Sequence, residues 1–179
     1  MRRTSRIATV LLLGLSLILL IGCHRLEIPA MTRTERVALK SYHGRYVSAL
    51  GVGEDWAVTQ HPGPEPDDCA WFTAYHLGED SRGYDRIALE TCYGRFVTAP
   101  RRGTTRLDRM VWQESGFGDC GQFIVEPQDN GKFALMTCAG KYLTTGDDGP
   151  TWPVPWAIVV QDQSQPTVEE WETFTIVAP

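Results

Sequence analysis

The stretch Arg36-Val-Ala-Leu-Lys-Ser-Tyr-His-Gly-Arg-Tyr-Val-Ser-Ala49 decides the fold, because the chain contains two further copies of it. These copies are Arg86-Ile-Ala-Leu-Glu-Thr-Cys-Tyr-Gly-Arg-Phe-Val-Thr-Ala99 and Lys132-Phe-Ala-Leu-Met-Thr-Cys-Ala-Gly-Lys-Tyr-Leu-Thr-Thr145. Successive copies start 50 and 46 residues apart, a spacing at which self-similarity indicates the architecture of the whole domain. We therefore expect three structural units that share one core.

Each copy has the pattern of a β-hairpin. In the first copy Val37 and Leu39 alternate with Ala38, which is the period of a strand with one buried face. A glycine follows where a tight turn can require a positive φ, and an aromatic residue then opens a second strand. The turn glycines are Gly44, Gly94 and Gly140, and the aromatic residues are Tyr46, Phe96 and Tyr142.

Two further recurrences complete each unit. Third strands are expected at 56–60, 109–113 and 157–161, each ending in glutamine, with Val58, Val111 and Val159 in register. Fourth strands are expected at 71–74, 122–125 and 172–176. The result is an all-β chain with four strands per repeat, which the strand pattern alone would leave as a sandwich or a barrel.

The repeat length, the apolar-Ala-Leu opening, the Gly-cation-aromatic turn and the closing Trp171-Glu-Thr-Phe174 resemble the fascin-like β-trefoil family over residues 37–177. The resemblance implies that six strands close a short barrel and that three hairpins cap it around a pseudo-threefold axis. We expect one β-trefoil domain at 36–179, with repeats at about 36–85, 86–131 and 132–179.

The N-terminal region, residues 1–22, is predicted to be a lipoprotein signal peptide. Arginines at positions 2, 3 and 6 precede an apolar run at 7–21 that is too short to span a hydrocarbon core of about 30 Å. The ending Leu20-Ile21-Gly22-Cys23 resembles the bacterial lipobox, which implies cleavage before Cys23 and lipidation of that cysteine. The alternative is an ordinary signal whose cleavage region happens to contain Cys23. Residues 23–35 are expected to form the lipidated cysteine and a short tether.

These features predict a protein anchored by lipid in the bacterial cell envelope. Its acyl chains would each contribute about 0.8 kcal/mol per buried methylene, and His24 after Cys23 resembles lipoproteins sorted to the outer rather than the inner membrane of Gram-negative cells. Without residues 1–22 the chain has 14 basic and 22 acidic residues, a net charge of -8. An acidic domain repels phosphate backbones, so we expect no nucleic-acid partner.

Four cysteines follow Cys23, and an exported compartment permits disulfides. Four cysteines allow three connectivities, but their places in the repeat select one. Cys69 and Cys120 stand three residues before a fourth-strand Phe, whereas Cys92 and Cys138 stand three residues after a first-strand Leu. Strand four of one repeat is expected to pair antiparallel with strand one of the next, which predicts the pairs Cys69–Cys92 and Cys120–Cys138.

The third junction, between repeat three and repeat one, is expected to lack a disulfide. We assign Trp171 and Ser41 to its two cysteine positions. A zinc site is the competing interpretation of four cysteines, but the sequence contains no Cys-x-x-Cys and no Cys/His cluster, so we expect no metal.

The sequence contains no motif for catalysis or for a cofactor. It has no Gly-x-Ser-x-Gly, no His-Glu-x-x-His, no phosphate-binding glycine-rich loop and no dinucleotide fingerprint. The histidines at positions 24, 43, 61 and 76 stand singly and are interpreted as surface residues. The carboxylate pairs at 67–68 and 147–148 lie in loops rich in Gly and Pro. We predict that the protein is not an enzyme.

The loops between strands two and three differ between the repeats, and unlike loops on a shared scaffold are where function is expected. The loop of repeat three contains Trp152 and Trp156 among prolines, beside Asp147 and Asp148. Rigid aromatic faces next to carboxylates suit stacking on a sugar ring. The structural alternative is that one of these tryptophans, Trp156 above all, plugs the barrel end.

The second loop carries a different chemistry. Its three arginines, at positions 101, 102 and 106, form a cationic cluster that can contact anionic headgroups or remain simply solvated. Two classes of function follow from the whole sequence. The first is a non-catalytic binding module, monomeric and lipid-anchored, that recognises a glycan or an envelope protein through its loops. The second is a structural subunit or an inhibitor of an envelope complex, without a small-molecule ligand. Actin bundling, known in fascin-like proteins, is not carried over.

Overall fold

The computed structural model describes residues 34–51, 57–61, 63–101, 110–116, 118–145, 158–160 and 168–179. These residues form twelve strands. The strands are β1 (Thr34–Ser41), β2 (Tyr46–Ala49), β3 (Val58–His61), β4 (Trp71–Glu79), β5 (Asp85–Glu90), β6 (Phe96–Thr98), β7 (Trp112–Glu114), β8 (Phe123–Pro127), β9 (Phe133–Met136), β10 (Leu143–Thr145), β11 (Ile158–Val160) and β12 (Thr173–Val177).

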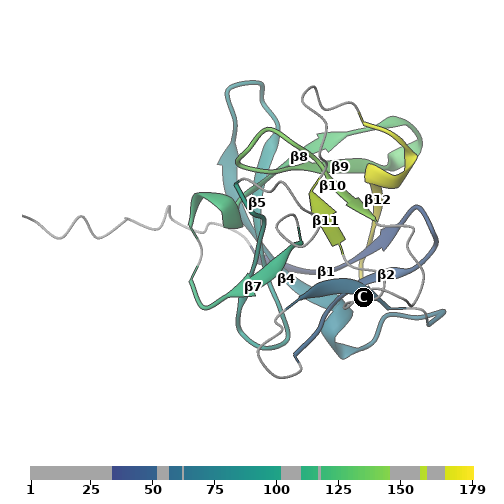
Figure 1. Cartoon of the computed structure of the whole chain (residues 1–179). Coiled ribbons are helices and arrows are strands. Elements are labelled where there is room, and N and C mark those ends of the chain that lie inside the picture. The colour runs from purple at the N-terminus through teal and green to yellow at the C-terminus, as the bar shows by residue number, and fades with distance from the viewer. Residues whose placement is uncertain are drawn as a thin grey trace, which may run out of the picture.

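Six strands close into a barrel. Strand β1 pairs antiparallel with both β4 and β12, and the ring continues through the pairs β4–β5, β5–β8, β8–β9 and β9–β12. The remaining strands form the hairpins β2–β3, β6–β7 and β10–β11, one in each repeat (Figure 1). A closed six-stranded barrel with three hairpins is the β-trefoil, which confirms the predicted fold class.

The shared glycines form the turns between the first and second strands of each repeat. Gly44, Gly94 and Gly140 have φ values of +74°, +68° and +69°, a region that L side chains rarely adopt. Each glycine N–H donates to the carbonyl oxygen three residues earlier, at 2.9 to 3.0 Å. The glycine of the repeated sequence therefore specifies this turn through its backbone conformation.

The core lies inside the barrel and follows the repeat. Phe72, Phe123 and Phe174 are 0%, 0% and 1% exposed, as their equivalent positions predict. The first-strand leucines Leu39, Leu89 and Leu135 pack in the same apolar cluster.

The third strands meet at the pseudo-threefold axis, where one predicted register is wrong. The backbone N–H of Val58 donates to the carbonyl of Val111 at 3.0 Å, and the N–H of Val111 donates to the carbonyl of Ile158 at 2.9 Å. Ile158 is 1% exposed, so it and not Val159 is equivalent to Val58 and Val111. The run Ile158-Val-Val160 is apolar throughout, and without alternation the sequence could not indicate which residue faces inward.

The two predicted disulfides, Cys69–Cys92 and Cys120–Cys138, are present, each with a Cα–Cα separation of 5.0 Å. The assignment of Ser41 to the third junction is wrong. Ser41 pairs with Phe174 in the β1–β12 ladder, and the residue three positions after Leu39 is Tyr42. Tyr42 and Trp171 therefore occupy the places that cysteines hold at the other two junctions.

The helical parts of the described chain are short 3-10 turns: η1 (Asp68–Ala70), η3 (Asp119–Gly121), η4 (Asp129–Gly131) and η5 (Glu170–Glu172). Within the described ranges, no helix has the length and apolar character needed to cross a membrane. The predicted signal peptide lies outside these ranges, as does nearly all of the predicted tether. The domain boundaries proposed from the sequence stay predictions.

Candidate functional site

The residues predicted to bind a ligand lie outside the described part of the chain. This holds for Asp147, Asp148, Trp152 and Trp156, and also for the lipidation site Cys23. Strand β10 ends at Thr145, immediately before the loop that contains the two tryptophans. These assignments remain predictions, and a different candidate site lies among the described residues of repeat two.

Repeat two carries an open groove with a cavity volume of about 460 Å³. One side is the segment 98–101, which leaves the end of β6, and the other side is the segment 118–121, which includes the 3-10 turn η3. Trp112 and Glu114 of β7 complete the lining. The backbone N–H of Ala99 donates to the carbonyl of Cys120 at 2.9 Å and holds the two sides together.

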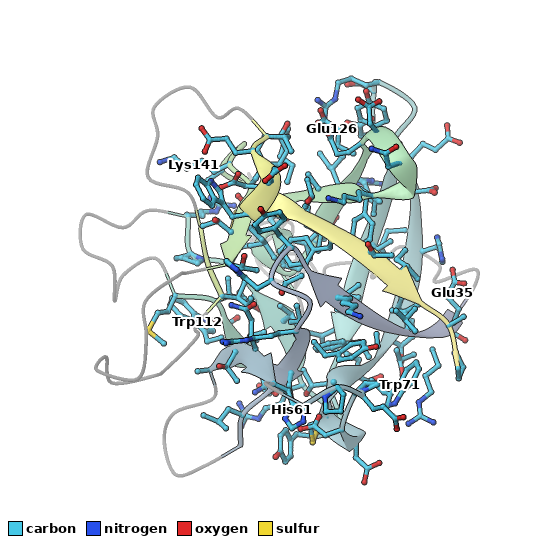
Figure 2. The ribbon with its side chains drawn as sticks, turned by 90° about the vertical axis from the view of Figure 1, so that its right-hand side faces the viewer. Glu35, His61, Trp71, Trp112, Glu126 and Lys141 are labelled. Carbon is cyan, nitrogen blue, oxygen red and sulfur yellow. A yellow bond between two sulfur atoms is a disulfide. The ribbon has the colours of Figure 1, made fainter. Side chains whose placement is uncertain are left out.

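Trp112 supplies the aromatic surface of this groove. It is half-buried and stands two residues from Glu114, so both side chains point to the same face of β7, while Gln113 between them is buried. The indole Nε1–H donates to Glu114 Oε1 at 3.0 Å. This bond fixes the edge of the ring. In Figure 2 Trp112 lies at the left of the molecule, away from Trp71 at the lower right.

Charged groups line the groove next to this ring. Arg101 Nη2 donates to Asp119 Oδ2 at 2.9 Å, and Arg101 Nε lies 3.4 Å from Cys120 Sγ. Both charged side chains are well exposed, at 68% and 71%, so the pair contributes little to stability but presents donors and acceptors to solvent. With Glu114, the groove offers a carboxylate on each side, a guanidinium and one indole face.

The equivalent positions of repeat one carry polar contacts of their own. Ser48 Oγ donates to Asp67 Oδ1 at 3.1 Å, and His61 Nδ1 lies 3.3 Å from Asp67 Oδ2. The pairing of β2–β3 and β6–β7 places Thr59 opposite Ser48, where repeat two has Trp112 opposite Thr98. In repeat three the corresponding residue is Val159, opposite Thr144. The tryptophan at this strand position therefore belongs to repeat two alone.

A second surface feature lies at the third junction, where Tyr42 and Trp171 replace a disulfide. We call this surface the junction patch and define it by Tyr42, Trp171, Glu169, Glu170 and Lys132. The two rings are 44% and 45% exposed. The Tyr42 hydroxyl hydrogen-bonds to Glu170, which raises the pKa of Tyr42, and the Trp171 Nε1–H donates to Glu169 Oε2 at 2.7 Å.

The histidines are more engaged than the sequence suggested. His76 Nε2 lies 2.5 Å from Glu35 Oε1, and His61 contacts Asp67 as described above. Within the described ranges no group of three or more His, Cys, Asp or Glu side chains is arranged to hold a metal ion.

Sequence reasoning missed Trp112 because it considered only aromatic residues along the second-to-third-strand loops. The sequence Trp112-Gln113-Glu114 did indicate the orientation of Trp112, because its central glutamine recurs at the end of the predicted third strands. Because Gln113 is equivalent to Gln60 and both are buried, its two neighbours had to face outward.

No family model and no curated protein matches this chain. Solved structures do match. The designed threefold-symmetric protein ThreeFoil has a TM-score of 0.59 at 14% identity, over 80% of this chain and 99% of its own. SeviL, solved bound to asialo-GM1 saccharide, has a TM-score of 0.56 at 13% identity, over 82% and 98%. A Caenorhabditis elegans protein of unknown function has a TM-score of 0.61 at 11% identity, over 83% and 97%.

These likenesses span nearly the whole length of each neighbour and agree with the strand pairing, so the chain is a β-trefoil protein. At identities of 11% to 14% these likenesses establish the fold alone, so the function has to be argued from the site.

Proposed function

We propose that the protein is a carbohydrate-binding module that holds its ligand in the groove of repeat two. The observation that carries the proposal is the half-buried Trp112, whose indole is tied to Glu114 inside a groove lined by Arg101 and Asp119. An aromatic face packs on the C–H face of a pyranose ring, and carboxylate and guanidinium groups bond to its hydroxyls.

The geometry favours a sugar over a purely apolar ligand. Every charged group of the groove is exposed and keeps hydrogen-bonding capacity beyond its present partner, because a carboxylate accepts at two oxygens and a guanidinium has five donors. Among the described lining residues, Glu114, Asp119 and Arg101 together carry a formal charge of -1, which at these side chains favours a neutral over an anionic sugar. A neutral glycan is therefore the expected ligand class, and the glycan-bound neighbour SeviL supports such a use of the fold.

The test is a glycan array probed with the chain from His24 onward, followed by titration of the strongest neutral glycan. Trp112→Ala should weaken that binding at least about tenfold, as expected for a tryptophan at the centre of a contact. Tyr93→Ala is the matched control, because Tyr93 is an exposed aromatic residue, at 45%, outside the groove. Binding that survives Trp112→Ala unchanged would refute the groove as the site.

An array without any bound glycan would refute the proposed function itself. The alternative from the sequence, a structural subunit or inhibitor of an envelope complex, would then be the remaining class.

We also propose that Cys23 is lipidated and that the module is held at the bacterial cell envelope, with the outer membrane favoured. The support is the sequence Leu20-Ile21-Gly22-Cys23 after an apolar run and an arginine-rich start. An anchored module with its groove on the barrel surface would present that groove to glycans near the membrane.

A further inference from the structure

The junction patch is the place where the pseudo-threefold symmetry is chemically broken. At the two other junctions the equivalent residues are joined by disulfides with Cα atoms 5.0 Å apart. At the third junction Tyr42 follows the end of β1 and Trp171 lies in η5, just before β12, and β1 and β12 are paired. By their equivalence to the disulfide-bonded cysteines, the two aromatic residues occupy neighbouring places on the surface, and they are 44% and 45% exposed.

Both rings are held at their polar edges by carboxylates. The Tyr42 hydroxyl is bonded to Glu170, and the Trp171 Nε1–H is bonded to Glu169 at 2.7 Å. Glu169 and Glu172 form a reciprocal capping box at the start of η5. In this box the Glu169 backbone N–H donates to the Glu172 carboxylate at 2.9 Å, which fixes the position of Glu169. Glu172 is 3% exposed and anchors this arrangement in the protein.

Hydrogen bonds from ring edges to carboxylates have an electrostatic consequence. A phenol O–H or indole N–H that donates to an anion leaves more electron density on the ring, and a cation is attracted to the face of such a ring. The structure already contains one example: the Lys132 Nζ lies 5.7 Å from the centre of the Tyr42 ring. The two glutamates outweigh this single lysine, so the junction patch has a formal charge of -1.

We propose that the junction patch is a binding site for a quaternary ammonium group, such as that of choline. Alkylated ammonium is favoured over a primary amine because its methyl groups pack on exposed aromatic faces and it is weakly hydrated, whereas a primary ammonium keeps its water. Glu169 and Glu170 supply the compensating charge. The junction patch shares no residue with the groove of repeat two.

The experiment is a titration of the full-length protein in a non-ionic polyoxyethylene detergent with choline, at ionic strength held constant with sodium chloride. Binding is followed by calorimetry and by ligand-observed NMR. Two partly exposed cation–π contacts, together with the charge of Glu169 and Glu170, predict a Kd on the order of millimolar. The neutral isostere 3,3-dimethylbutan-1-ol has the same shape without the charge and should bind at least about fivefold more weakly.

Three variants locate the site. Trp171→Ala should weaken choline binding about fivefold, and the Tyr93→Ala control should leave it unchanged. Lys132→Met should strengthen binding, because it removes the cation that now lies over Tyr42. Lys132→Met tests the proposal by a gain of affinity, which a damaged fold would not produce.

The proposal is overturned if no binding is seen at choline concentrations of roughly tens of millimolar, which are well above the expected Kd. It is also overturned if the neutral isostere binds with the same affinity as choline, or if both Trp171→Ala and Lys132→Met leave the choline affinity unchanged. None of these results depends on whether the groove of repeat two binds a sugar.

Discussion

A third disulfide placed at the junction patch would test the closure of the barrel. The pseudo-symmetry predicts that Tyr42→Cys and Trp171→Cys together form a bond, since the residues at the same positions of the other junctions are already bonded. The native bonds close loops with sequence separations of 23 and 18, which correspond to about 3.4 and 3.2 kcal/mol on the chain-entropy model. The new bond would join residues 42 and 171 and so close a loop of 129 residues. The same model gives about 5 kcal/mol for it.

The reference for this measurement is the double variant Tyr42→Ser and Trp171→Ser, which loses the same aromatic side chains and the Tyr42–Glu170 hydrogen bond without gaining a crosslink. Mass spectrometry after thiol alkylation would show whether the bond forms, and urea unfolding of both variants under oxidising conditions would give the difference in free energy. Engineered bonds often give less than the model, so we expect a gain between about 2 and 5 kcal/mol. Two free thiols in the folded variant would refute the pseudo-symmetric placement of Tyr42 and Trp171.

Three further predictions concern the core, a buried tyrosine and the anchor. Phe72→Ala, Phe123→Ala and Phe174→Ala should each lower the free energy of unfolding by about 3 to 5 kcal/mol in urea titrations, and a cost below about 1 kcal/mol at one position would place that ring outside the shared core. Burial and the hydrogen bond to Glu126 raise the pKa of Tyr142 to about 12, so its contribution to the free energy of unfolding is complete below pH 10 and is lost as pH rises toward 12. Tyr142→Phe should therefore reduce the loss of stability between pH 10 and pH 12. An unchanged dependence of the free energy of unfolding on pH would contradict the raised pKa of Tyr142. A fatty-acid analogue should label the wild-type protein in cells but not Cys23→Ser, and equal labelling would exclude lipidation at Cys23.

The fold could be predicted because the residues that determine it recur. The turn between the first and second strands requires a positive φ in every repeat, and a glycine supplies it each time. A Phe near the start of the fourth strand fills the barrel in every repeat. The same recurrence, together with the expectation that strand four of one repeat pairs with strand one of the next, selected one disulfide connectivity out of three. These inferences needed only that the three units be alike and that they follow one another around the barrel.

The errors occurred where that likeness weakens. The predicted register of β11 was wrong by one residue because Ile158-Val-Val160 is apolar throughout. The hydrogen bond from Val111 to Ile158 and the burial of Ile158 show which residue faces the axis. The assignment of Ser41 to the third junction was a separate error of one residue, because the offset of three residues after the first-strand Leu, which gives Cys92 and Cys138, gives Tyr42 after Leu39.

The same reasoning explains why the candidate sites were hard to predict. A residue that builds the barrel meets the same packing in all three repeats, so similar residues recur at its equivalent positions. Trp112 does not recur in this way, because its equivalent positions hold Thr59 in repeat one and Val159 in repeat three. Its outward orientation follows from the buried Gln113 beside it, and its chemistry follows from Glu114 two residues on. Tyr42 and Trp171 likewise differ from the cysteines at equivalent positions. In a β-trefoil the deviations from the repeat, read against the strand register, are therefore the places where function is to be sought.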